Sequence, residues 1–286
     1  MRKVRIVADS TSDIPQEIRE RLGIEMIPLK VIFGEQSYLD AVTISQEQFY
    51  DKLTKEPALP TTSQPSPVDF MEMYERILDA EPGVAIISIH LSAALSGTYQ
   101  SAILGSSMLE RECDVSVYDS KSASYGIGML VVKAAEMAEA GCTKDEILQA
   151  IEQLKADMKL YFLVDTLEYL QKGGRIGKAA ALFGSILNIK PILSLDSEGV
   201  VTAIEKVRGQ KKAMGRILDL LTSEFGNDPV EMTLAWTTSS EAALELGRLA
   251  SERLDVRSTS HTHIGAVIGT HVGPGTSAIF VHRVKG

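Results

Sequence analysis

The sequence predicts an α/β protein of two domains: an N-terminal domain on a doubly wound, mainly parallel sheet, and a C-terminal α+β domain. Over residues 1–160, short apolar runs alternate with helical stretches, which is the pattern of parallel strands joined by crossover helices. After that point, strands follow one another in pairs. A chain of 286 residues is long enough for two ordinary domains. We therefore expect domains over residues 1–160 and 161–286.

The chain opens with a strand, a polar loop and a helix. Residues 4–8 form an apolar strand, and Pro15 suits the first turn of the helix that follows the loop. Residues 25–33 are predicted as a single strand. Pro28 within it cannot donate a backbone hydrogen bond, so we expect this strand at a sheet edge.

The remaining N-terminal elements continue the alternation. Strands are expected at 84–89 and 115–119, and helices at 46–53, 68–78, 97–110 and 124–140. Thr143 and Glu146 have the spacing of a capping box, which predicts that another helix begins there.

The C-terminal domain has a different pattern. A strand at 161–164 is followed by a glycine-rich stretch and then by residues 179–187, which are apolar almost all round and predict a helix without a solvent face. Strands at 191–195 and 200–207 are joined by a hairpin turn. The other expected elements are helices at 210–225 and 241–254 and strands at 232–236, 256–261 and 278–282.

Composition excludes several classes of function. The net charge is −9 and the basic residues are scattered, which argues against a nucleic-acid partner. Cys113 and Cys142 are too few for a disulfide framework and lack companions at metal-ligand spacing, so no metal is expected. The N-terminus leads directly into a strand rather than a signal peptide, and no run is long enough for a membrane span. We expect a cytoplasmic protein.

Two clusters of small polar residues point to an anion-binding site. Thr61, Thr62 and Ser63 form a row of hydroxyls between prolines, which can hold a carboxylate or phosphate, although a helix cap and turn is the simpler interpretation. Ser96 follows the strand at 84–89, where a helix starts and its backbone amides favour an anion. At the carboxyl ends of parallel strands the two clusters would converge on one group.

His271 precedes a Gly-Pro-Gly turn and forms a third cluster. Its imidazole can donate to an anion if it is protonated or in the right tautomer, whereas a lone histidine is more often structural. The other histidines are expected to be structural, because none has a suitable polar companion in sequence; they are His90, His261, His263 and His282. No nucleophile-elbow motif surrounds any serine, so no Ser-His-Asp set is expected.

Two familiar motifs fail on inspection. The stretch 173–178 ends in Gly-Lys, but a phosphate-binding loop needs glycine where Lys172 stands and Ser or Thr where Ala179 stands. Asp9 would need a second aspartate at position 11 to act as in haloacid-type phosphatases, and Thr11 is there instead. We expect Asp9 to cap the first loop.

Five stretches, taken in order, resemble the successive signatures of the DegV family. They are VRIVADSTS at 4–12, TTSQPSP at 61–67, LSGTYQSA at 95–102, DTLEYLQKGGRIGK at 165–178 and GTHVGPG at 269–275. The resemblance implies a fatty-acid-binding protein with one long acyl chain buried between its two domains and no other cofactor. In the bacterial fatty-acid kinase system, proteins of this type present the carboxylate to a separate kinase subunit and keep the acyl phosphate for phospholipid synthesis.

The resemblance also implies roles for individual residues. Thr62 and Ser96 match the carboxylate-binding positions, and Thr61, Ser63 and His271 are neighbours in the same hydrogen-bond network.

Further positions concern the partner and the tail. Arg208 matches a position linked with kinase docking, although a solvated cap at the end of its strand is an equal alternative. Residues 182–193 would line the tail. Ala93 and Ala94 stand where relatives often carry a more polar residue, so we expect a drier inner edge of the head-group site.

Two other functions stay open. One is a hydrolase or phosphotransferase that uses the same hydroxyl and histidine cluster, with Asp9 or His271 as the base. The other is a regulatory lipid sensor, which would have the same pocket but no kinase partner. A transient contact with a membrane is compatible with a lipid ligand.

Overall fold

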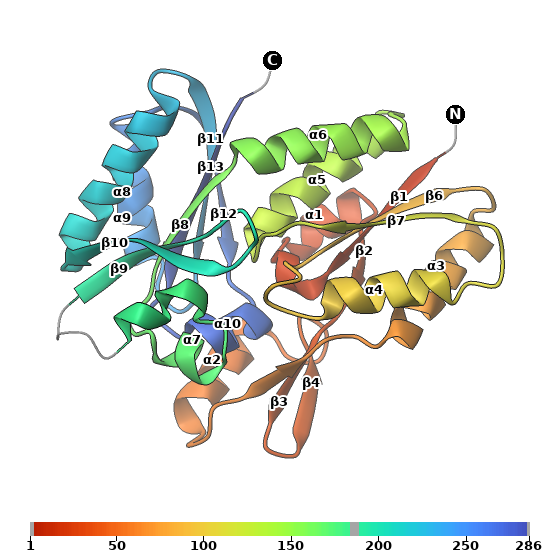
Figure 1. The fold of residues 1–286 in the computed structure, drawn as a ribbon, viewed down its shortest axis with the longest axis horizontal. Coiled ribbons are helices and arrows are strands. Elements are labelled where there is room, and N and C mark those ends of the chain that lie inside the picture. Colours follow the sequence, from red (N-terminus) through yellow and green to blue (C-terminus); the bar gives the residue numbers. More distant parts are fainter. Residues whose placement is uncertain (1–2, 184–188, 285–286) are drawn as a thin grey trace.

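The computed structural model describes residues 3–183 and 189–284. Its N-terminal part contains a four-stranded sheet in the order β2-β1-β6-β7, and all neighbouring pairs are parallel. The strands are β1 (Val4–Asp9), β2 (Glu25–Ile27), β6 (Ala85–His90) and β7 (Asp114–Asp119). Helices lie on both faces of this sheet, as Figure 1 shows. The doubly wound, parallel N-terminal sheet is confirmed.

Side chains that alternate along β1 explain the two helical layers. Ile6 and Ala8 pack with the layer of α5 (Tyr125–Glu139), whereas Val7 points to the other face and packs with α3 (Pro67–Ala80). The α5 layer also contains α1 (Gln16–Arg21) and α6 (Lys144–Asp157), and the α3 layer contains α4 (Thr98–Ser107). The predicted capping box opens α6.

A small antiparallel sheet in the order β4-β3-β5 was not expected. It contains β3 (Lys30–Phe33), β4 (Gln36–Leu39) and β5 (Thr61–Ser63), with α2 (Gln46–Lys55) packed against it. The prediction of one strand over 25–33 is therefore wrong. The chain leaves one sheet after Ile27 and enters another at Lys30, and Pro28, which lacks an amide donor, lies between them. The hydroxyl stretch, expected as a loop, contains an edge strand.

The C-terminal part is built on a six-stranded mixed sheet in the order β10-β9-β8-β13-β11-β12. Its strands are β8 (Lys159–Leu163), β9 (Ile189–Leu195), β10 (Val201–Arg208), β11 (Pro229–Trp236), β12 (Asp255–His263) and β13 (Ser277–Arg283). Helices α8 (Gln210–Phe225) and α9 (Glu241–Ser251) cover one face with a separate core. The other face shares one continuous core with α5, so the two parts pack directly against each other.

Three short elements differ from the expectation. Helices α7 (Glu168–Lys172) and α10 (Ala266–Val272) were not predicted. The expected helix over 179–187 is instead the 3₁₀ segment η2 (Gly177–Leu182), and residues 184–187 lie outside the described part of the chain. The expectation of no solvent face is also wrong there, because Phe183 directly after η2 is 46% exposed.

Two further findings concern membrane-spanning helices and metal sites among the described residues. None of their helices combines the length and the apolar character needed to cross a membrane. They also contain no group of three or more metal-ligating side chains placed to hold an ion. The domain boundary near residue 160 stays a prediction.

Candidate functional site

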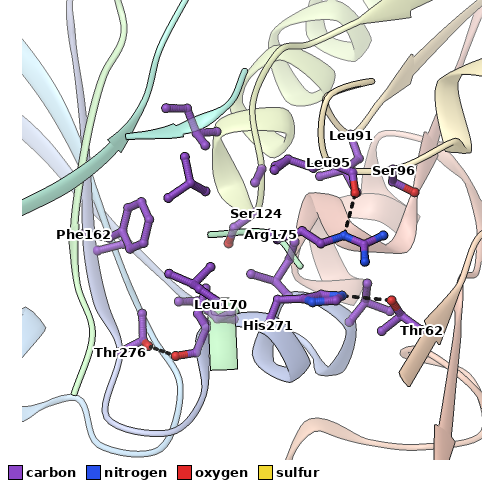
Figure 2. Close-up of a pocket in the computed structure, with 18 of the residues that line it drawn as sticks. Thr62, Leu91, Leu95, Ser96, Ser124, Phe162, Leu170, Arg175, His271 and Thr276 are labelled. Carbon is purple, nitrogen blue, oxygen red and sulfur yellow. Dashed lines mark hydrogen bonds between the residues drawn. The ribbon is translucent and has the colours of Figure 1, made fainter. Parts of the chain in front are cut away.

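A cavity with a largely apolar lining lies where the two parts of the chain meet. The space inside it that a water-sized molecule can occupy is about 90 Å³. Figure 2 shows Thr62, Ser96, Arg175 and His271 together at one end, and Gln64 also lines the cavity. The rest is mostly apolar; its lining includes Leu91, Leu95, Leu160, Phe162, Leu170, Leu195, Val201, Ile264, Val267, Ile268, Ala278 and Phe280. The cavity therefore has a polar head and an apolar body.

Strand β5 points one hydroxyl into the cavity and two away from it. Thr62 is half-buried and lines the polar end, whereas Thr61 and Ser63, its neighbours in the strand, are exposed and do not line the cavity. This is the alternation of side chains along a strand. Thr62 Oγ1 lies 2.9 Å from His271 Nε2. The structure thus brings Thr62 and His271 together and separates Thr61 and Ser63 from them.

His271 is held as a neutral side chain in the last turn of α10. Burial lowers the pKa of its imidazole to about 4, and the charge of Arg175 adds to this effect. Its buried Nδ1 has no partner among the described residues, so we place the ring proton on Nε2, where it donates to Thr62 Oγ1. The hydroxyl hydrogen of Thr62 is then free to point at a ligand. Of the two forms considered for His271, protonated or neutral in the right tautomer, this environment favours the neutral one.

Glycine at position 173 makes room for the imidazole. A Cβ atom there would lie 2.4 Å from His271 Nδ1 and 3.0 Å from the Tyr169 carbonyl oxygen. Both distances are shorter than normal contacts. Helix α7 can therefore approach α10 closely only because residue 173 has no side chain.

Arg175 supplies the positive charge of the polar end, and the sequence interpretation missed it. Its Nε donates to the Leu95 carbonyl oxygen at 3.0 Å and its Nη1 to the Gly173 carbonyl oxygen at 2.8 Å. Among the described residues Nη2 has no partner, and Figure 2 shows the guanidinium between Ser96 and His271. The signal was present, because Arg175 is the one arginine in the glycine-rich stretch at 173–178, and that stretch is also part of the family signature at 165–178.

Ser96 reaches the same end of the cavity from the loop after β6. Its Oγ lies 2.9 Å from Thr98 Oγ1 and accepts a hydrogen bond from the Thr98 amide at 3.3 Å. Gln64 from the β5 segment lies beside Gly97, where a Cβ would come within 2.4 Å of its side chain. The expected convergence of the Thr62 and Ser96 clusters is therefore present in the geometry, although their part in binding stays a prediction.

Other expected positions lie elsewhere. Arg208 is exposed at the end of β10 and does not line the cavity. Ala93 and Ala94 are also exposed, so they are on the outside rather than at an inner edge. The apolar wall expected over 182–193 comes instead mainly from β8, β13 and α10, with Leu195 of β9 and Val201 of β10. Leu182 and Leu193 do not line the cavity, and 184–188 lie outside the described residues.

Asp9 belongs to a closed network away from the cavity. It accepts a hydrogen bond from the Thr11 amide at 3.0 Å, which is the expected capping role. His90 Nδ1 lies 3.0 Å from Asp9 Oδ2, and His90 Nε2 lies 2.6 Å from Ser88 Oγ. Burial raises the pKa of Asp9, but the hydrogen bond and charge of His90 outweigh it and hold that pKa below its usual value.

The expectation that His90 lacks polar companions, and that no Ser-His-Asp set forms, is thus wrong. Ser88, His90 and Asp9 do align, but all three are fully buried at 0% exposure. Ser88 Oγ also accepts a hydrogen bond from the Tyr74 hydroxyl at 2.8 Å. No substrate can reach this set in the folded protein, so we interpret it as a structural link between β1 and β6.

Comparison with known proteins agrees with this geometry. The family model described as "Uncharacterised protein, DegV family" matches residues 3–284. A DegV domain-containing protein of Caldanaerobacter subterraneus is 39% identical over 283 residues, which are 98% of this chain and 99% of that protein. Two solved structures are similar throughout. A fatty-acid-binding DegV family protein from Thermus thermophilus has a TM-score of 0.91 at 38% identity, and covers 99% of this chain and 100% of its own.

The second structure is DegV from Bacillus subtilis, described as a fatty acid binding protein. Its TM-score is 0.88 at 35% identity, again with 99% of this chain and 100% of that chain covered. The family match and both structures extend over nearly the whole length of the sequence. The chain belongs to the DegV family.

Proposed function

We propose that this protein binds one long-chain fatty acid in the cavity between its two parts. The carboxylate lies at the polar end near Thr62, Ser96 and Arg175, and the tail extends along the apolar walls. The observation that carries this proposal is the division of one continuous cavity into a polar head and an apolar body. The similarity to proteins described as fatty-acid-binding supports it.

The polar end has the chemistry that a carboxylate needs. A buried carboxylate is costly unless donors replace its water. Arg175 offers a full positive charge and a free Nη2, and hydrogen bonds that involve charged groups are among the strongest in proteins. Thr62 and Ser96 add neutral hydroxyl donors, while neutral His271 orients Thr62. Three donors from three separate segments can thus hold one anion.

The apolar body has the chemistry that the tail needs. Burial of a sixteen-carbon chain at about 0.8 kcal/mol per methylene contributes about 12 kcal/mol before ordering costs. Those costs leave a surplus large enough for tight retention. The tail therefore provides affinity, and the carboxylate provides orientation.

We propose further that any phosphorylation of the bound fatty acid is done by a separate kinase subunit. The histidine nearest the carboxylate is a poor base at neutral pH because burial lowers its pKa. The Ser88, His90 and Asp9 set is sealed. Exposed Arg208 is the proposed docking residue; Arg208→Glu should slow phosphorylation by such a kinase while fatty-acid retention stays unchanged. Equal rates would show that Arg208 is not the docking residue, and no phosphorylation of either protein would favour the sensor hypothesis. A cytoplasmic location and transient membrane contact stay predictions.

Mass spectrometry of the purified protein tests the binding function. We expect one bound species of fatty-acid mass under native conditions and its loss after solvent extraction. The extracted protein should take up added fatty acid stoichiometrically and leave it chemically unchanged. A protein that neither carries nor takes up fatty acid would contradict the proposal, and slow conversion of the added lipid would favour the enzyme hypothesis.

A further inference from the structure

A second hollow lies directly behind the apolar end of the cavity. The space inside it that a water-sized molecule can occupy is about 470 Å³, and it is lined by the loop after β7, the end of α6 and the β9–β10 turn. Two residues line both spaces, Leu160 and Leu195. These two side chains are therefore the shared wall between the cavity and the hollow.

The shared wall is at the end of the cavity opposite the polar cluster. Leu160 and Phe162 are two positions apart in β8 and share a face of the strand. Figure 2 shows Phe162 across the cavity from Thr62 and Ser96. Leu195 is the last residue of β9. Both leucines are half-buried and pack against the main core, so their positions are defined by contacts.

The hollow behind the wall has a mixed lining. Three lysines line it, and each is paired: Lys121 with Glu198 at 3.1 Å, Lys155 with Glu152 at 2.8 Å and Lys159 with Glu224 at 3.1 Å. Apolar side chains, among them Met158 and Ile204, lie beside these ion pairs. Extra methylenes beyond the wall would therefore gain only part of the usual burial energy.

We propose that Leu160 and Leu195 determine the upper limit of acyl-chain length by closing the tail end of the cavity. The proposal rests on the fatty-acid-binding function. It assigns specificity to two residues that touch the terminal methyl group and not the carboxylate. Removal of either side chain joins the cavity to the hollow, and addition of bulk shortens the cavity.

Competition among saturated fatty acids that differ by two-carbon steps tests the proposal. The extracted protein is mixed with the series, and the bound fraction of each acid is read by native mass spectrometry. Leu160→Ala and Leu195→Ala should shift the preferred acid to a longer chain. In these variants two further carbons can occupy the space that the leucine side chain leaves. Because each buried methylene contributes about 0.8 kcal/mol, an acid two carbons longer should gain roughly tenfold in relative preference.

Two further variants complete the test: a control that enlarges the cavity away from the wall, and a bulkier side chain in the wall. Leu170→Ala removes a leucine that lines the cavity but not the hollow, so it should weaken all acids alike without a shift in preferred length. Leu195→Phe should shift the preference to a shorter chain, and circular dichroism verifies that each variant is folded. If Leu160→Ala, Leu195→Ala and Leu195→Phe all keep the wild-type preference, the wall proposal is wrong. If the wild-type protein takes up no acid of the series, the binding function itself fails.

Discussion

The hydroxyl of Thr62 gives the sharpest test at the polar end, because its strand neighbour is a matched control. Thr62→Val keeps the shape and removes the hydrogen bond, which should cost about 1 kcal/mol, or roughly fivefold in fatty-acid affinity. Thr61→Val changes the same residue type one position away, where the side chain is exposed. We expect no change in affinity there. Equal losses of affinity in both variants, measured by competition binding, would show that the Thr62 hydroxyl does not contact the fatty acid.

Arg175 should matter more than Thr62, because it carries a charge. Arg175→Gln removes the charged donor and should weaken fatty-acid binding by roughly tenfold to a hundredfold, the range for hydrogen bonds to charged groups. Lys172→Gln is the control, since Lys172 is exposed on α7 and pairs with Glu168. Dissociation rates of a fluorescent fatty acid measure both. An Arg175→Gln protein with a wild-type rate would place the carboxylate elsewhere.

The lowered pKa of His271 predicts that the folded protein loses stability in acid. Its folded pKa of about 4 is below the ordinary value of 6.5, so the unfolded chain binds the proton more tightly. The stability contributed by neutral His271 is present above pH 6.5 and is lost as the pH falls toward 4. Between pH 7 and pH 5 the loss should be about 2 kcal/mol. Urea unfolding at both pH values should show this loss in the wild type and a smaller one in His271→Gln; equal losses would contradict the prediction.

At the scale of elements, the close packing of α7 on α10 predicts the effect of a single methyl group. In Gly173→Ala the new Cβ would overlap His271 Nδ1, so the imidazole must move away from Thr62. We expect a loss of about 1 to 3 kcal/mol in stability, the usual cost of overpacking, and weaker fatty-acid binding. Thermal unfolding and competition binding measure the two effects.

Gly215 offers the matched control for that variant. It lies within α8, and a Cβ there would have nothing within 4 Å. Gly215→Ala should therefore stabilise the protein by about 0.5 to 1 kcal/mol, since alanine is the better helix residue. A Gly173→Ala protein that behaves like Gly215→Ala would show that α7 and α10 can separate without cost.

At the scale of the whole molecule, a set of hydrogen bonds fastens the two parts together beside the cavity. The stretch from the end of β12 to the start of α10 meets the N-terminal part through five of them. They are Thr262 Oγ1 to the Asp13 carbonyl oxygen (2.6 Å), Gly265 N to Asp13 Oδ1 (2.9 Å), Ala266 N to Asp40 Oδ1 (3.2 Å), Gln46 Nε2 to the Ile264 carbonyl oxygen (2.7 Å) and the Tyr50 hydroxyl to the same oxygen (2.9 Å). The same segment leads into α10, which carries His271.

Asp40 makes this junction sensitive to pH. Burial raises the pKa of its carboxyl to about 6, and the charge of Asp9 acts in the same direction against the hydrogen bonds from Ser10 and Ala266. The folded protein therefore holds the proton more tightly than the unfolded chain. The stability contributed by this group is fully present below pH 3.8 and is lost as the pH rises through about 6, on the order of 3 kcal/mol in total.

Asp40→Asn tests that prediction, because asparagine has the same shape and does not titrate in this range. The loss of stability with rising pH, measured by urea unfolding from pH 4 to pH 8, should be smaller in the variant than in the wild type. The part that remains belongs to Asp13 in the same junction, whose pKa is also raised by burial. The trend is opposite in sign to that of His271, so the two variants distinguish the groups. A wild-type pH profile in Asp40→Asn would show that Asp40 is ionised at no cost.

Much of the fold was predictable, because its long elements have local signals. The helix predicted at 210–225 has the bounds of α8, and the capping box at Thr143 opens α6. The alternation of strands and helices predicted the parallel N-terminal sheet. Short elements were missed for a physical reason. Helix α10 has seven residues and depends on contacts with α2 and β3, which are far away in sequence.

The sequence by itself determined the family, the class of fold and the candidate residues Thr62, Ser96 and His271, since these depend on residue types in a local pattern. The tertiary structure alone decided which residues meet. The pairing of β5 with β3 turns Thr62 inward and leaves Thr61 and Ser63 outside. Burial makes His271 neutral, and Arg175 becomes the cation of the site. Such outcomes depend on strand register, burial and distance between segments remote in sequence, and no local pattern encodes these.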